Sequence, residues 1–273
     1  MANQTVTTVA AFIPEIWSDE VVATYKANLV VANLVKGLNH NGKKGDTIHL
    51  PSPGRSSASA KVKNTDVTAI VDTAADISVL INKHYEYSMY IEDIAALQAL
   101  NSMRKFYTDD AGYALSKQVD TDIITDMRTN GTGDIASITN WDTSILAAIE
   151  TLNDNDAPMN GRSLVVSPSA YTALLSTERF TEQQFIGNGN AISTGKVGMI
   201  YGVDVFVSSN IGTGAVEKGI LFQKDALCLA TQQSVRTQTQ YQQEKLADLF
   251  TADTIYGTKV VRPSSIVEMR SGT

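Results

Sequence analysis

Few residues of this chain have the types and spacing that chemistry would need. The sequence holds three histidines, His40, His49 and His84, and one cysteine, Cys228. No two of the histidines stand at the i, i+4 spacing with which a helix binds a metal. Cys228 lies in the apolar run Ala226–Ala230, which predicts a buried and inert thiol. The G-x-S-x-G pattern of hydrolases is absent. We therefore predict no catalytic residue, no metal site and no cofactor site.

Three carboxylates crowd the end of a long periodic segment. They are Asp120, Asp122 and Asp126, of which only Asp122 and Asp126 share a helix face. Such a pair could hold a divalent cation or act in acid–base catalysis. A solvated acidic face, partly offset by Lys117 and Arg128, is the interpretation that we adopt.

A second charged cluster is basic. Between residues 41 and 70 the cluster consists of Lys43, Lys44, Arg55, Lys61 and Lys63. The acidic residues in the same range are Asp46 and Asp66. No aromatic residue is interleaved with these cations, so stacking on single-stranded nucleic acid is not supported. A contact with an acidic partner surface, such as the acidic helix of a neighbouring copy, is the functional alternative.

Composition narrows the class of protein. The chain has 273 residues, a net charge of −7 and a hydrophobic content of 43%. This content excludes an intrinsically disordered chain, and the negative charge argues against a dedicated nucleic-acid binder. No apolar run approaches the length of roughly 18 residues that a membrane span needs. The first positive charge is Lys26, so we expect no secretory signal.

Hydrophobic periodicity predicts the elements of the first part of the chain. Apolar steps of three and four residues predict a helix from about 14 to 35, ending at Gly37. Residues 45–51 are predicted as a short strand and 77–91 as one long strand. Between them, 52–64 contain Val62 as their one large aliphatic residue, so this stretch cannot supply a core. The pattern indicates a hairpin that reaches away from the body.

The rest of the chain predicts an α+β fold. No proline interrupts a periodic segment from Glu92 to Arg128, which predicts one long helix. Helices at 144–152 and 168–175 alternate with strands at 163–167, 199–207 and 219–223, with Ser167 as an N-cap. Segments at 231–243, 255–261 and 266–269 are predicted as closing strands.

The order of these parts resembles a known family. The relevant segments are I-P-E-I-W-S-D-E-V at 13–21, G-D-T-I-H-L-P at 45–51, the run Gly195–Ser208 and the run Ile255–Pro263. With the basic excursion and the long helix, they resemble the major capsid protein of tailed bacteriophages, which has the Hong Kong 97-like fold. The resemblance covers nearly the whole chain.

The resemblance implies an architecture for this sequence. It implies an N-terminal arm at 1–40, an extended loop with its strands at 41–91, and a peripheral domain with a long spine helix at 92–133. An axial domain at 134–230 and closing strands of the peripheral domain at 231–273 complete it. The expected loop contacts between subunits are Pro51, Arg55, Lys61, Val62 and Lys63. The expected core face of the spine helix is Leu97, Leu100, Met103, Phe106, Leu115, Val119 and Ile123.

The resemblance also implies a function. It implies a structural shell subunit, not an enzyme, that assembles as pentamers and hexamers into an icosahedral head around double-stranded DNA. The implied partners are other copies, a separate scaffolding protein, a portal and a decoration or cement protein, with non-specific DNA contacts and no membrane. Assembly is expected in the bacterial host cytoplasm, and the product is the virion. An encapsulin-type nanocompartment shell and a soluble α+β enzyme are the alternatives.

Overall fold

The computed structural model of the chain describes residues 30–42, 44–52, 58, 60–67, 75–92, 103–176, 198–212 and 218–271. The helices are α1 (Val31–Leu34), α3 (Met103–Asn130), α4 (Trp141–Asp154) and α5 (Pro168–Ser176), with short 3₁₀ turns at Ser209–Ile211, Lys224–Ala226 and Pro263–Ser265. Among the described helices, none is long and apolar enough to cross a membrane.

The strands form three sheets. Their bounds are β1 (Lys36–Asn39), β2 (Thr47–Ser52), β3 (Ala75–Leu80), β4 (Lys83–Glu92), β5 (Gly133–Ile135), β6 (Arg162–Val166), β7 (Met199–Ile200), β8 (Val203–Val207), β9 (Lys218–Gln223), β10 (Leu227–Gln242), β11 (Ala247–Val260) and β12 (Ile266–Arg270). Their spatial orders are β1-β10-β11-β4, β5-β12-β9-β6-β8-β7 and β2-β3. Mixed helices and strands confirm the predicted α+β class at this level.

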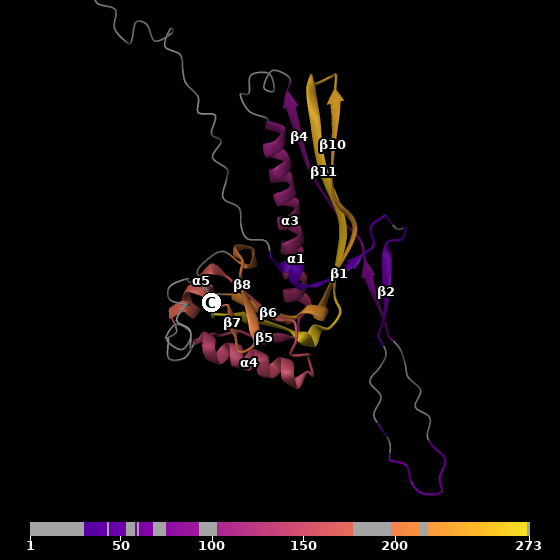
Figure 1. Ribbon diagram of the computed structural model, residues 1–273, viewed down its shortest axis with the longest axis vertical. Coiled ribbons are helices and arrows are strands. Elements are labelled where there is room, and N and C mark those ends of the chain that lie inside the picture. Colours follow the sequence, from indigo (N-terminus) through magenta and orange to yellow (C-terminus); the bar gives the residue numbers. More distant parts are fainter. Residues whose placement is uncertain are drawn as a thin grey trace, which may run out of the picture.

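The first sheet is long and lies beside α3 (Figure 1). An antiparallel hairpin of β10 and β11 forms its centre, and β4 pairs with β11 over its whole length. The burial of β4 alternates residue by residue, because successive strand side chains point to opposite faces. Ala111 and Leu115 of α3 pack against Phe250 and Ala252 of β11, so the helix covers one face of this sheet.

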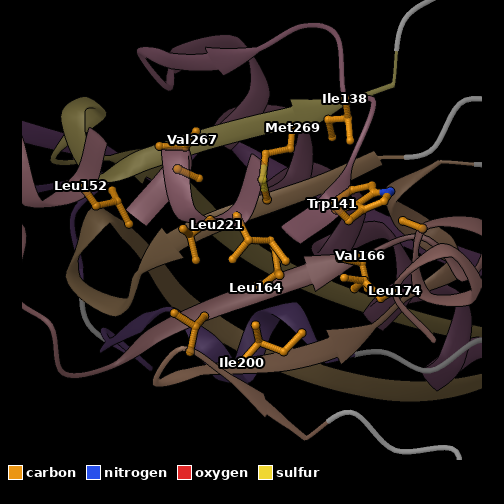
Figure 2. Packing of buried hydrophobic residues seen from close by; sticks show 14 of the residues in the cluster. Ile138, Trp141, Leu152, Leu164, Val166, Leu174, Ile200, Leu221, Val267 and Met269 are labelled. Carbon is orange, nitrogen blue, oxygen red and sulfur yellow. The ribbon is translucent and has the colours of Figure 1, made fainter. Parts of the chain in front are cut away.

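The second sheet has a core of its own. In β6 every residue is buried, because β8 and β9 flank it and side chains cover both of its faces. On one face Leu164 and Val166 meet Trp141 of α4 and Leu174 of α5, as Figure 2 shows. On the other face Val165 joins a separate cluster described next.

The C-terminal half of α3 joins the two sheets. Ile123, Ile124 and Met127 pack in one buried cluster with Val165, Ile220 and Phe222 of the second sheet. Val31 and Val35, at either end of α1, enter the same cluster. The N-terminal half of α3 therefore packs against the first sheet, and its C-terminal half contacts both sheets.

The structure corrects several predicted boundaries. The single strand predicted over 77–91 is two strands, because β3 pairs with β2 and β4 pairs with β11. Glu92 ends β4 instead of opening the long helix, which is described from Met103 onward; residues 93–102 lie outside the described residues. The strand predicted at 199–207 is a tight hairpin of β7 and β8.

Two further differences concern the ends of the chain. The final strand β12 belongs to the second sheet, between β5 and β9, so 231–273 does not close the first sheet as one unit. Of the helix predicted over 14–35, residues 31–34 are helical as α1, and 14–29 lie outside the described residues. The predicted helices near 144–152 and 168–175 are confirmed as α4 and α5.

Candidate assembly surfaces

The β2–β3 hairpin carries the loop that the sequence marks as a contact surface. All described side chains of this loop, at 58 and 60–67, are exposed. Lys61 and Lys63 are among them, and Val62 and Val67 have exposed fractions of 64% and 78%. Pro51 is exposed near the end of β2, and Arg55 lies outside the described residues. The described tip of the loop lies apart from both larger sheets (Figure 1).

The contacts of the loop tip are local. Lys61 Nζ donates to the carbonyl oxygen of Val62 at 3.0 Å, and Thr65 Oγ1 donates to the same oxygen at 2.8 Å. The exposed valines are apolar surface that a partner could bury, and the neighbouring lysines could make charged contacts at the edge of that interface. The described tip therefore exposes apolar and cationic side chains side by side.

The base of this hairpin is fixed to the first sheet. Val79 and Ile81 are buried together with Ala230 of β10, and the N–H of Ile81 donates to the Asp46 carbonyl at 2.7 Å. Gly257 of β11 lies directly against the chain here. A Cβ at this position would lie 2.2 Å from the Leu80 carbonyl oxygen and 2.9 Å from Ile81 Cα. Only glycine therefore lets β11 pass so close to the point where the chain turns from β3 into β4.

Two carboxylates of α3 hold the helix to β11. Asp122 accepts from the Tyr256 hydroxyl at 2.8 Å, and Asp126 accepts from the Thr258 hydroxyl. Two residues of a strand advance about 6.8 Å, and four residues of a helix advance about 6 Å. The i, i+2 step of the strand thus matches the i, i+4 step of the helix, and both pairs form side by side.

A lysine from the neighbouring strand completes this contact. Lys83 of β4 lies 3.2 Å from Asp122 Oδ2 and donates to Thr258 Oγ1 at 2.9 Å. Tyr256 is 1% exposed, and burial together with the Asp122 carboxylate raises the pKa of its hydroxyl. The interpretation of these carboxylates as a solvated acidic face is wrong, since they bind helix to sheet.

Asp120 has a different partner on the opposite side of α3. Its side chain is buried and accepts from the backbone N–H groups of Val31 and Ala32, at 3.4 and 2.9 Å. These N–H groups open α1, where no earlier carbonyl can accept from them. Burial raises the pKa of Asp120, and the two N–H bonds oppose that rise. Asp120 therefore fixes the start of α1 against α3.

We expect Asp122→Ala to destabilise the subunit by about 1–3 kcal/mol, because it leaves the buried Tyr256 hydroxyl without its acceptor and the Lys83 ammonium without its carboxylate partner. Urea unfolding followed by circular dichroism measures this. In a Tyr256→Phe background the same change should cost less, since the two groups interact directly. Asp154→Ala, at an exposed position of α4, is the control and should change stability by less than about 0.5 kcal/mol. Equal unfolding curves for Asp122→Ala and the parent chain would contradict this prediction.

The described side chains predicted for the core face of α3 are buried or half-buried. Leu115 and Ile123 are buried, with exposed fractions of 3% and 0%, and Val119 is half-buried against the cluster that joins the sheets. Met103 and Phe106 lie in α3, but their side chains are not among those described. Leu97 and Leu100 lie outside the described residues.

The histidines and the cysteine form no reactive group in the described chain. His49 pairs with Asp76 at 2.5 Å on the exposed β2–β3 hairpin, and His84 lies 3.3 Å from Asp253. Cys228 is buried, and burial raises the pKa of its thiol. Among the described residues, no three His, Cys, Asp or Glu side chains gather as metal ligands would. In the described part of the chain, His49 and His84 thus lie beside carboxylates, and the Cys228 thiol is buried.

Comparison with known proteins identifies the family of this chain. The model of a family described as phage capsid protein matches residues 32–271. A comparison with curated proteins gave no match.

Solved structures share the fold over nearly the whole chain. A chain from Mycobacterium phage Che8 is 25% identical, with a TM-score of 0.83 and coverage of 94% of this chain and 97% of that chain. A chain of the capsid of cyanophage P-SCSP1u is 17% identical, with a TM-score of 0.84 and coverage of 100% and 97%. A chain of the capsid of a native GTA particle is 10% identical, with a TM-score of 0.74 and coverage of 100% of both chains.

Proposed function

The chain belongs to the phage capsid protein family, and we propose that it is the major shell subunit of a tailed-phage head with the Hong Kong 97-like architecture. The observation that carries this proposal is the family match over 32–271, supported by capsid chains of the same fold at full length. The family is structural, and we propose a structural role for this chain rather than an enzymatic one.

We propose the following parts for the subunit. Residues 1–40 form the arm and 41–91 the extended loop with its strands. The first sheet with α3 forms the peripheral domain, and the second sheet, including β12, forms the axial domain. Copies meet through the axial domains as pentamers and hexamers, and the loop tip with Lys61, Val62 and Lys63 braces a neighbouring subunit.

The net charge of −7 is compatible with a wall around double-stranded DNA. A strongly basic inner surface would hold DNA non-specifically, with a steep dependence on salt. A shell that only encloses DNA needs no such binding. The proposed partners are a separate scaffolding protein, a portal, a decoration protein and DNA contacted without sequence preference, with assembly in the host cytoplasm.

Expression of the chain with its scaffold tests the proposal. We expect closed hollow particles of many copies by electron microscopy and native mass measurement, and double-stranded DNA in particles from infected cells. A stable monomer under assembly conditions would rule out the shell function. Closed particles that hold a cargo enzyme and no DNA would instead identify a nanocompartment.

A further inference from the structure

The outer edge of β10 is open over half of the strand. β1 pairs with β10 only from Cys228 to Thr231, and His40 and Gly42 add backbone bonds to Thr231 and Gln232. Beyond this point, no described strand pairs with that edge. Every side chain from Ser234 to Tyr241 is exposed, so both faces are uncovered as well. In Figure 1 this half of β10 lies on the side of the sheet away from α3.

The segment Arg236–Gln240 has neither the proline nor the bulge with which proteins protect such edges. Edge strands are usually guarded by charge, proline or a bulge, or are kept short. The register irregularities of β10 end at Arg236, and the pairing with β11 is regular from Thr237 to Gln242. Threonine favours extended backbone, and no proline interrupts the segment.

The one charge in this segment is already compensated. Arg236 stands directly opposite Asp253 of β11, and its guanidinium donates to both carboxylate oxygens, at 3.2 and 3.1 Å. Burial opposes ionisation of Asp253, but hydrogen bonds from Arg236, Gln233 and His84 hold its pKa below the usual value. The edge is therefore neutral on a chain whose net charge is −7.

The other outer strands of the described sheets are guarded or short. β4 exposes His84, Glu86 and Glu92 along the opposite edge of the same sheet. In the third sheet, Pro51 of β2 has no N–H to donate, and β3 exposes Asp76. β1, β5 and β7 have four, three and two residues. Among the described edges, only the outer edge of β10 is both long and without unpaired charge or proline. The described strand edge that suits it best as a pairing partner is therefore the same edge of another copy.

We propose that Arg236–Gln240 of β10 pairs antiparallel with Arg236–Gln240 of a second copy across a two-fold axis, which rests on the proposed shell function. This pairing joins two four-stranded sheets into one continuous sheet. A register centred on Gln238 places Thr237 opposite Thr239, and Arg236 opposite Gln240. Threonine then faces threonine, Gln238 faces Gln238, and no two like charges are opposed. Such a contact is isologous, so each copy supplies the same surface.

A hollow beside the edge can receive side chains from the added strand. It has a volume of about 490 Å³ and is lined by Gln238, Thr239, Gln240, Leu249 and Thr251. Amide and hydroxyl groups supply both donors and acceptors there. The partner is therefore a neutral, extended, hydroxyl- and amide-rich strand, which is what a second copy offers.

Cysteine cross-linking in assembled particles tests this pairing. Each residue from Thr237 to Gln240 is changed to cysteine, singly and as neighbouring double variants, so that any register centred on this segment opposes two thiols. Opposed strand positions bring their Cβ atoms to about 4.5–5.5 Å, and the closest of them, in non-hydrogen-bonded pairs, reach the upper end of the range that a disulfide spans. Under mild oxidation we expect covalent dimers that the parent chain, whose Cys228 is buried, does not form. Ser88→Cys on the charged edge of β4 is the matched control and should stay monomeric.

Lysines at the same edge provide the second test. Thr237→Lys with Thr239→Lys should leave the melting temperature of the subunit unchanged, because both positions are exposed, and should abolish the dimers or the closed particles. Ser88→Lys should do neither. Particles that form normally while no edge cysteine gives a dimer would overturn the pairing and leave the shell function standing. A chain that never forms particles would instead refute the shell function.

Discussion

Gly257→Ala is expected to destabilise the subunit by about 1–3 kcal/mol, or more, and to prevent normal shell assembly. The added Cβ would lie 2.2 Å from the Leu80 carbonyl oxygen and 2.9 Å from Ile81 Cα. Both atoms belong to the backbone, so no side chain can rotate away to make room. The chain must move at the point where β3 ends and β4 begins. The extended-loop hairpin, which leaves the body there, would change its direction.

A second glycine provides the matched control for this prediction. Gly112 lies within α3, and a Cβ built there meets nothing within 4 Å. Gly112→Ala should therefore stabilise the subunit by roughly 0.5–1 kcal/mol through the higher helix propensity of alanine. Thermal unfolding compares the two variants, and limited proteolysis within 58–67 reports on the hairpin. If Gly257→Ala melted as high as the parent chain and assembled normally, the close approach would have no structural importance.

Hydrophobic periodicity and capping residues, which act within a few residues of the chain, predict the helices α4 and α5. The periodicity at 144–152 gave α4, and Ser167 before Pro168 gave the start of α5, where Ser167 Oγ accepts from the Ala170 N–H at 3.3 Å. The loop at 52–64 was expected to be exposed because Val62 is its only large aliphatic residue. The described loop side chains, including Val62, are exposed.

Strand partners could not be read in the same way. Odd-numbered residues are mostly apolar from Ile77 to Ile91, and this alternation continues across the junction of β3 and β4. Side chains alternate between two faces in every strand, whichever sheet the strand belongs to. The alternation therefore does not show where the chain changes from one pairing partner to another. The same holds for β12, whose short apolar segment fits either larger sheet.

The acidic residues of α3 show why polar contacts are the hardest part to predict. Helix spacing places Asp122 and Asp126 on one face, which the sequence does show. Their hydroxyl partners, however, lie 134 and 132 residues away on β11. A carboxylate in solvent and a carboxylate that binds a buried tyrosine have the same local sequence. Without the tertiary contact, exposure was the reasonable expectation, and it was wrong.

Removal of the extended loop should abolish the shell while leaving the subunit folded. Ser52 of β2 pairs with Ala75 of β3, so a short Gly-Ser turn in place of 53–74 keeps the hairpin base intact. The described loop side chains are exposed and bond locally, and fixing each loop residue costs about 1–2 kcal/mol of backbone entropy. The melting temperature of the subunit should therefore hardly change.

The expected loss of assembly follows from the contacts that Val62 and Lys61 would make with a neighbouring subunit. If the proposed shell contact forms, these exposed groups gain a partner surface, and the loop contributes its contact energy to the particle. A full-length variant with Lys61, Val62 and Lys63 all changed to serine separates the side-chain contribution from loop length, and we expect it to weaken assembly without abolishing the fold. Electron microscopy scores closed particles, and circular dichroism scores the fold. Normal particles from the shortened chain would refute the bracing role. Loss of the fold would place the loop in the subunit core, which the exposed Val62 and Val67 argue against.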